Sequence, residues 1–436
     1  MDPVKVGLLG FGTIGAGVVK AFQCNGDLLA RRLGRPVELV RIADLDITSP
    51  RPVQVDRSLL TTDAAAVIDD PAIGIVIELI GGYEPARTFV LRAIANGKHV
   101  VTANKALLAL HGEEIFRAAE SAGVDVMFEA SVGGGIPIIS AIKENLCANR
   151  FESVFGILNG TCNYILTRMT DEGADFGKVL ADAQAKGYAE ADPTFDVEGI
   201  DTTHKLALLC SLCFGTWVDF KSIYTEGITR ITALDIEYAR EFGYKFKLLA
   251  IGKRVNGQIE ARVHPTMLPL DHPLAKVDGV FNGVRLVGDC VGPVMLYGYG
   301  AGMDATASAV MGDVMAIVRG LGAGKAMRTP AMGCPQAAVE QLPVKPMDEL
   351  VSSYYLRVFV KDQPGVLAQI AGVLGRYRIS IESMIQPHRH EADAVPILLM
   401  THEAVERDIR AALAEIDQLD AARGQSLFVR IEEQSE

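Results

Sequence analysis

A glycine-rich turn near the N-terminus constrains the fold of this chain more than any other feature. Gly10, Gly12 and Gly15 fit the pattern G-x-G-x-x-G, between an apolar run at 4–9 that predicts a strand and a helical pattern from about 13 to 24. There the first glycine allows a tight turn, the second lets the backbone approach a pyrophosphate, and the third lets the helix pack on the strand. The turn therefore predicts a dinucleotide site at the N-terminus of this helix.

The same strand–helix theme repeats through the first third of the chain. Apolar runs at 37–43, 73–79, 98–103 and 124–130 are separated by helical patterns. Strands that alternate with helices predict a parallel, doubly wound sheet, so we expect a Rossmann domain over residues 1–136. A glycine-rich loop and helix at about 300–330 are expected to return to it.

Beyond residue 136 the pattern changes to an α+β domain, expected over 137–300. Asn-Gly pairs at 256–257 and 282–283, each flanked by apolar residues, predict two type I′ hairpins and hence a mixed sheet. Prolines without periodicity predict a linker at 331–351. Residues 352–432 then read strand–helix–strand–strand–helix–strand, which predicts a ferredoxin-like module.

Charge and cysteine content exclude several classes of partner. The net charge of −12 argues against binding to nucleic acid or an anionic membrane surface. The apolar N-terminal run has no basic leader or cleavage site, and no apolar run is long enough to span a membrane. Seven scattered cysteines do not make a disulfide framework. We therefore expect a cytoplasmic protein.

Within 186–209, a run of acidic residues lies just ahead of Lys205. Asp201 and Lys205 are four residues apart, so on a helix they can touch, and Glu190 precedes them. A carboxylate that orients a lysine beside further acids suits a small zwitterion, whose ammonium needs an anion and whose oxygen needs a proton. The competing interpretation is an ordinary surface ion pair at a helix start.

Six motifs in order resemble homoserine dehydrogenase, in the long bacterial form with a C-terminal ACT domain. They are GFGTIG, VVTANKALLA, FEASVGGGIPII, LNGTCNYIL, KGYAEADPTFDVEGIDTTHKLALL and GAG…TASAV, and residues 354–432 are similar to an ACT domain. The resemblance implies an α/β fold with a Rossmann domain, a substrate and dimerisation domain, and a regulatory domain. It also implies NAD(P)-dependent interconversion of L-homoserine and L-aspartate 4-semialdehyde, toward threonine, methionine and isoleucine, by a homodimer or homotetramer.

The resemblance also assigns roles to residues. Lys205 looks like the catalytic proton donor and Lys105 like a second active-site lysine, with Glu190 and Asp201 as homoserine-binding carboxylates. FEASVGGGIP looks like a sodium loop, although a flexible hinge would read the same. Its implied ligands are Glu129 and the carbonyls of Val132, Gly134 and Ile136. The implied cofactor-binding residues are Gly10, Phe11, Gly12, Thr13, Ile14, Gly15, Asp44, Lys105, Gly187 and Gly302.

The choice between NAD and NADP stays open. Asp44 ends the second predicted strand and could bind the ribose hydroxyls of NAD, while Arg51 and Arg57 could hold the extra phosphate of NADP. We expect tolerance of both cofactors.

Two rival functions and one regulatory question remain. Cys162, near the start of a helix predicted over 161–186, could make the chain an aldehyde dehydrogenase that works through a thiol, but no histidine is evidently paired with it. The ACT-like module could instead make it a non-catalytic amino-acid sensor. The segment DQPGVL at 362–367 resembles the effector loop of ACT domains, which suggests feedback inhibition by L-threonine; an ACT domain that only assembles the oligomer is the alternative.

Overall fold

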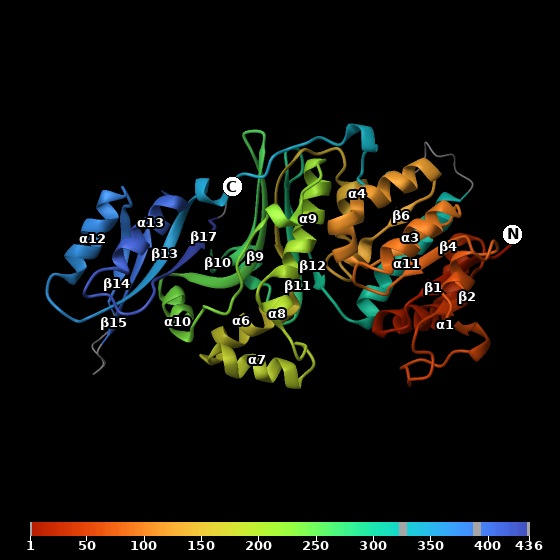
Figure 1. Cartoon of the computed structure of the whole chain (residues 1–436), viewed down its shortest axis with the longest axis horizontal. Helices are drawn as coiled ribbons and strands as arrows, with labels where there is room; N and C mark the ends of the chain where they lie inside the picture. Colours follow the sequence, from red (N-terminus) through yellow and green to blue (C-terminus); the bar gives the residue numbers. More distant parts are fainter. Residues whose placement is uncertain (1, 322–328, 387–393, 434–436) are drawn as a thin grey trace.

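The computed structural model describes residues 2–321, 329–386 and 394–433. Parts of two predicted segments lie outside these residues: 322–328 of the return segment, and 387–393 of the C-terminal module. Figure 1 shows an elongated molecule, with the N-terminal layers at one end, a middle domain, and the C-terminal module at the other end. Among the described helices, none combines the length and apolar character needed to cross a membrane.

The N-terminal domain is a parallel six-stranded sheet with helices on both faces. Its strand order is β3-β2-β1-β4-β5-β6. The strands are β1 Val4–Leu9, β2 Val37–Ala43, β3 Leu60–Thr61, β4 Ile75–Glu78, β5 His99–Thr102 and β6 Val126–Met127. Helices α1 (Thr13–Leu33) and α11 (Met303–Gly320) share one apolar core with the sheet, and α3 (Ala86–Ala95) and α4 (Lys105–Ala122) share another. The predicted Rossmann topology is confirmed.

Helix α11 reaches this domain from far along the chain. It packs so closely on α1 that a Cβ added at Gly17 would lie 2.7 Å from the carbonyl oxygen of Met303. The prediction that α1 ends near residue 24 is wrong, because the helix continues to Leu33 and ends at Gly34 in the left-handed region (φ 69°). Gly26 is tolerated inside α1, and Leu29 continues the buried face.

The middle domain contributes the first five strands of a mixed sheet ordered β12-β11-β7-β9-β10-β17-β13-β15-β14. These are β7 Phe151–Ile157, β9 Tyr244–Val255, β10 Gln258–Pro269, β11 Phe281–Gly288 and β12 Gly292–Tyr299; the short β8 (Tyr224–Thr225) pairs with β10. The helices are α5 Ile138–Ser140, α6 Gly160–Glu172, α7 Phe176–Ala185, α8 Thr194–Val197, α9 Ile200–Phe214 and α10 Ala233–Glu241.

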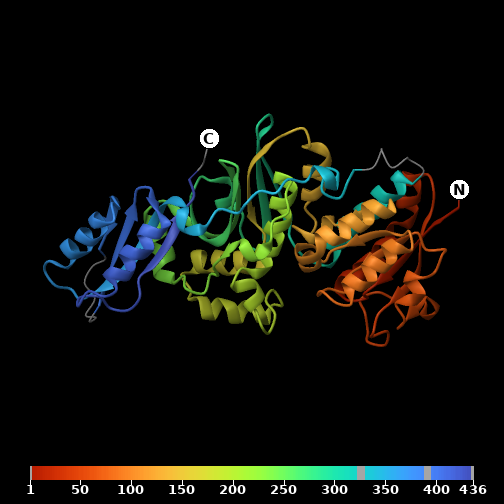
Figure 2. The same ribbon diagram turned by 45° about the horizontal axis from the view of Figure 1, so that its top comes forward.

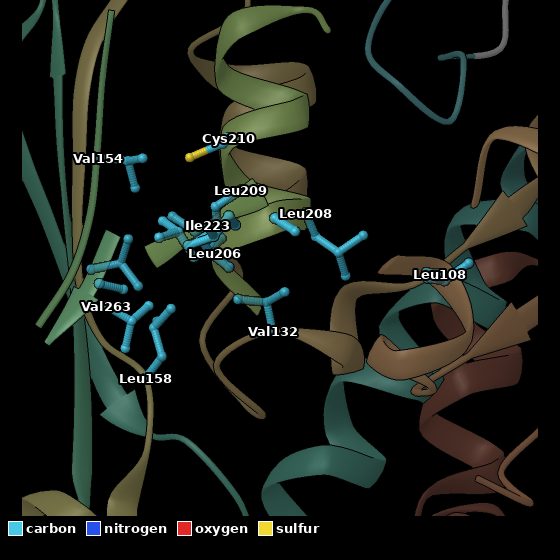
Figure 3. Close-up of a cluster of buried hydrophobic side chains, with 14 of the residues drawn as sticks. Leu108, Val132, Val154, Leu158, Leu206, Leu208, Leu209, Cys210, Ile223 and Val263 are labelled. Atoms are coloured by element: carbon cyan, nitrogen blue, oxygen red, sulfur yellow. The ribbon is translucent and has the colours of Figure 1, made fainter. Parts of the chain in front are cut away.

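Helix α9 is buried along its whole length except its first residue. Figure 3 shows Cys210 pointing at Val154 on the sheet, while Leu208 lies on the side that faces Leu108 of α4. A Cβ added at Gly252 of β9 would lie 2.5 Å from Cys210 Sγ, so helix and sheet are in close contact. α9 is therefore the element on which the middle and N-terminal domains meet.

One of the two predicted hairpins is present. Asn256 (φ 51°) and Gly257 (φ 78°) form the two-residue turn between β9 and β10, as predicted. The second prediction is wrong, because Asn282 and Gly283 lie inside β11, whose hairpin with β12 turns at 289–291. Gly283 is explained by packing instead: a Cβ there would lie 2.9 Å from Val277 Cγ2.

The C-terminal module has the predicted ferredoxin-like order. It comprises β13 Val351–Val360, α12 Val366–Arg376, β14 Ile381–Ile385, β15 Val395–Thr401, β16 Ala404–Val405, α13 Glu406–Ile416 and β17 Leu427–Ile431. Its β17 also pairs in parallel with β10 through Thr266–Arg430 and Met267–Ile431, so the module extends the middle sheet. Buried Arg430 stabilises the contact between the two domains. It donates to Glu406 in its own module, and to Glu226 of the middle domain at 2.6 Å.

The segment before the module is irregular, with only short turns. Figure 2 shows it crossing the middle domain from the N-terminal side to the C-terminal side. It is bonded to β10, because Ile259 donates to Pro343 and Lys345 donates to Ile259, at 2.9 and 2.8 Å.

Candidate active site

The glycine-rich turn has the geometry of a dinucleotide cradle. Gly10 has a φ of 96°, and a Cβ there would lie 2.6 Å from the Leu79 carbonyl oxygen; a Cβ at Gly15 would lie 2.2 Å from that of Gly10. Gly12 faces open space, as close approach of a pyrophosphate requires. α1 begins at Thr13, so the N–H groups of Thr13 and Ile14 lie in its first turn, where a helix has no acceptor of its own. These residues fit the phosphates of a dinucleotide.

A cavity of about 570 Å³ opens beside this turn, the size expected for a cofactor site. Gly10, Gly12, Asp44 and Leu45 line it together with residues of 62–65 and 79–92. The Asp44 carboxylate is held in its wall by two backbone donors, the N–H groups of Phe11 and Asp46. Arg51 lies over the Phe11 ring, with Nη2 4.0 Å from Asp44 Oδ1. Of the two candidate arginines, Arg51 therefore accompanies Asp44, while Arg57 starts a short 3₁₀ turn. Neither arginine is among the residues that line the cavity.

Lys105 is positioned by a buried network that sequence reasoning missed. Fully buried Glu78, at the carboxyl end of β4, accepts from Ile80 N at 2.8 Å and from the Thr102 hydroxyl at 2.7 Å. Asn104 caps α4 by accepting from Leu107 N at 3.1 Å and donates to Gly82 O at 2.7 Å. Lys105, the first residue of α4, thus lies at the strand ends where ligands bind in open α/β sheets.

The structure brings Lys205, Asp201 and Lys105 together. Asp201 Oδ2 accepts from Lys205 Nζ at 2.7 Å, and Asp201 Oδ1 lies 3.2 Å from Lys105 Nζ. Burial alone would raise the pKa of Asp201, but the two ammonium groups and the amide of Asn159 outweigh it and hold that pKa well below its usual range. The surface-pair interpretation is excluded for Lys205, because its side chain and that of Asp201 are buried.

The cluster is completed by Leu158 and Asn159, the first two residues after β7. The Leu158 carbonyl accepts from Lys205 Nζ at 2.7 Å, and Asn159 Nδ2 donates to Asp201 Oδ2 at 2.9 Å and to Asp196 Oδ1 at 2.7 Å. Sequence reasoning singled out neither residue for the site. Asn159 does carry a local signal, since an asparagine ahead of a helix start predicts an N-cap, but its bonds to the acids do not follow from sequence.

Three other predicted site residues form no hydrogen bond or ion pair with Lys205, Asp201 or Lys105 in the part of the chain that the structure describes. Glu190 is exposed, and its carboxylate forms no hydrogen bond with Lys205 or Asp201; its backbone carbonyl accepts from Gln184. Gly187 is left-handed (φ 74°) in the turn after α7. Gly302 (φ 115°) is the N-cap of α11, and a Cβ there would meet open space.

Glu129 stabilises the predicted cation loop, residues 128–137, through hydrogen bonds. Its two carboxylate oxygens accept from Ile139 N and Ser140 N at 2.7 and 2.8 Å. Burial raises the pKa of Glu129, and these donors only partly offset that effect. Gly134 (φ 56°) presses on the loop before α11, where a Cβ would lie 2.5 Å from the Gly300 carbonyl oxygen. Val132 and Ile136 are buried on either side of it. Within the described residues no three His, Cys, Asp or Glu side chains could share a metal ion.

Cys162 is poorly suited to act as a nucleophile. It is fully buried in the first turn of α6, and its Sγ donates to the Asp196 carbonyl at 3.2 Å. Burial raises the pKa of the thiol well above its ordinary value, which opposes thiolate formation.

Comparison with known proteins identifies the family of the chain. Residues 137–315 match the family model described as Homoserine dehydrogenase, residues 10–129 that described as Homoserine dehydrogenase, NAD binding domain, and residues 354–421 the ACT domain model. The chain is 46% identical to a homoserine dehydrogenase of Pseudomonas aeruginosa, covering 99% of this chain and 100% of that protein. It is 45% identical to that of Neisseria gonorrhoeae, covering 99% of both.

Solved structures of homoserine dehydrogenases also match this chain over nearly its whole length. The crystal structure of a homoserine dehydrogenase from Thiobacillus denitrificans superposes with a TM-score of 0.92 at 47% identity, covering 99% of both chains. That of Staphylococcus aureus gives 0.77 at 30% identity, also over 99% of both. These full-length matches show the family: the chain belongs to the homoserine dehydrogenase family of oxidoreductases, in the form that carries an ACT domain.

Proposed function

We propose that the chain interconverts L-homoserine and L-aspartate 4-semialdehyde with NAD or NADP, using Lys205 as the proton donor to the aldehyde oxygen. The observation that carries this proposal is the junction at which Asp201 of α9 contacts both Lys205 and Lys105. It lies where α4 starts, at the carboxyl end of β5, which is the edge of the sheet where a dinucleotide presents its reactive ring.

The hydrogen bonds of Lys205 suit proton transfer. An ammonium group has three N–H donors, and two are used by Leu158 O and Asp201 Oδ2. The third is left for the substrate oxygen. When the aldehyde is reduced, this oxygen gains negative charge as hydride adds to the neighbouring carbon. When bound, the dinucleotide supplies the hydride. Lys105 adds a second positive charge on the side of the nucleotide-binding domain.

The same proposal assigns the remaining predicted residues. Asp201 and Glu190 would bind the substrate ammonium; Asp201 already contacts both lysines, and exposed Glu190 would have to approach when substrate binds. Sodium at Glu129 and the carbonyls of Val132, Gly134 and Ile136 would brace the loop that contacts Gly300. Oxygen ligands of this kind suit a hard cation.

A steady-state assay of homoserine oxidation with each nucleotide tests the reaction. Because Asp44 lines the nucleotide cavity and Arg51 lies beside Asp44, we expect turnover with both NAD and NADP. Formation of reduced nucleotide is followed by absorbance, with L-serine and L-threonine as control alcohols. Absence of reduced nucleotide with homoserine and either cofactor would refute the proposal.

We further propose that the C-terminal module mediates inhibition by L-threonine through the loop at 362–367. This loop joins β13 to α12, and Gly365, the N-cap of α12, has a φ of 90°. Backbone groups at such a strand–helix junction can bind the charged ends of an amino acid. The resemblance also supports a homodimer or homotetramer and a cytoplasmic role in threonine, methionine and isoleucine synthesis.

The Gly365→Ala variant tests this regulation. An alanine at that φ is strained by about 1–2 kcal/mol. We expect the free loop to relieve this strain by shifting, so threonine binding must restore it and the threonine concentration for half inhibition should rise roughly tenfold, with uninhibited turnover retained. Gly375→Ala inside α12, where a Cβ meets open space, is the matched control. If L-threonine fails to inhibit the full chain, the proposed threonine regulation is refuted.

A further inference from the structure

Asn159 connects one end of α6 to the acidic residues of the active site. It follows β7 and caps α6, where its Oδ1 accepts from Cys162 N at 2.8 Å. Because Oδ1 must accept that bond, the NH₂ group is turned the other way. There it donates to Asp196 Oδ1 at 2.7 Å and to Asp201 Oδ2 at 2.9 Å. With 6% of its surface exposed and both ends of its amide bonded, the Asn159 side chain has one orientation.

This arrangement separates two like charges beside the proposed proton donor. Asp196 precedes Asp201 by five residues, and each carboxylate uses one oxygen to accept from the same amide. The oxygen of Asp201 that Asn159 holds is also the one bonded to Lys205. The preceding residue, Leu158, holds the same ammonium through its carbonyl. Two consecutive residues therefore fix both members of the Lys205–Asp201 pair.

We propose that Asn159 is a positioning residue for the homoserine reaction: its amide holds Asp201 in register so that the third N–H of Lys205 points at the reacting oxygen. This inference rests on the proposed function, since it assumes that Lys205 is the proton donor. Misplacing a reacting group by about 1 Å can cost roughly 10²-fold in rate, and free rotation of Asp201 would permit such a shift. Asn159 is not among the residues that line the cavity beside the glycine-rich turn.

Two variants separate this role from helix capping. Aspartate and serine are both favoured N-cap residues, so Asn159→Asp and Asn159→Ser keep an acceptor for Cys162 N while removing the two amide N–H groups that reach Asp196 and Asp201. Asn159→Ser adds no charge, so it remains informative if a third carboxylate unfolds the chain. The control is Asn149→Asp, at the opposite end of β7, where the amide bonds, among the described residues, only the backbone of Leu146 and Val291.

The measurements are kcat and KM in both directions, melting temperature, nucleotide binding by fluorescence, and the pH dependence of aldehyde reduction. We expect kcat to fall by about 10²-fold in both Asn159 variants, with nucleotide affinity unchanged. Relative to wild type, Asn159→Asp should recover rate as the pH falls, because a protonated carboxyl can donate again; Asn159→Ser should not recover.

Three results would overturn the inference: kcat in the folded Asn159 variants close to that of wild type, an equal loss in Asn149→Asp, or a loss explained wholly by lower melting temperature. The wild-type chain and Lys205→Met are assayed alongside. If wild type does not oxidise homoserine, or Lys205→Met still does so normally, the proposed function fails. If both behave as expected and only the Asn159 result disagrees, the positioning role alone fails.

Discussion

Replacing Lys205 with methionine is expected to lower kcat for homoserine oxidation by about 10³-fold, within the range that a positioned proton donor contributes. Methionine retains the buried apolar stem and removes the ammonium that bonds Leu158 O and Asp201. Lys105 still pairs with Asp201 in this variant, so the carboxylate is not left alone. Nucleotide affinity, measured by fluorescence, should not change, because the cradle lies in the other domain.

The matched control is Lys178→Met, which removes an exposed lysine from α7 in the same domain. Its kcat should equal that of wild type. An increase in KM for homoserine with unchanged kcat in Lys205→Met would instead identify a lysine that only binds substrate.

The Asp201→Asn variant should lose both stability and turnover. It leaves the Lys205 ammonium buried without its carboxylate, and breaking a buried pair in this way costs about 3–5 kcal/mol of unfolding free energy. Turnover falls because neither lysine keeps its charged partner. Glu113→Gln removes the acid of an exposed pair with the same four-residue spacing, and should cost less than about 1 kcal/mol.

The pH dependence of that stability difference has a defined sign. Because the folded-state pKa of Asp201 is lower than its ordinary value, its contribution is complete above the unfolded pKa of about 3.9. It is lost as the pH falls further toward the folded-state pKa. Urea unfolding of wild type and Asp201→Asn should therefore give a constant difference from pH 6 to pH 8, which shrinks below about pH 4. A difference that grows on acidification would contradict the ion pair.

Local patterns predicted those parts of the fold that local physics determines. The spacing of Gly10, Gly12 and Gly15 predicted a turn whose close contacts the structure shows. The pair at 256–257 predicted its hairpin, because both residues need positive φ. The pair at 282–283 did not, since Gly283 is required by contact with Val277, a neighbour that no local pattern reveals.

Long-range contacts were beyond sequence reasoning. The Asp201–Lys205 contact followed from helical spacing, but the approach of Lys105 depends on how two domains meet. Asn159 and Glu78 could be recognised only as a cap and a strand end, because their partners lie far along the chain. The pairing of β17 with β10 likewise joins residues separated by more than 160 positions, so the C-terminal module was predicted as separate rather than as an extension of the sheet.

The most direct test is a crystal structure of the chain with bound L-homoserine and an unreactive nucleotide. Lys205 Nζ should lie within hydrogen-bonding distance of the homoserine hydroxyl oxygen, about 2.7–3.2 Å, while still bonded to Asp201 and Leu158. A hydroxyl oxygen held by another group, with the Lys205 ammonium out of reach, would contradict the mechanism.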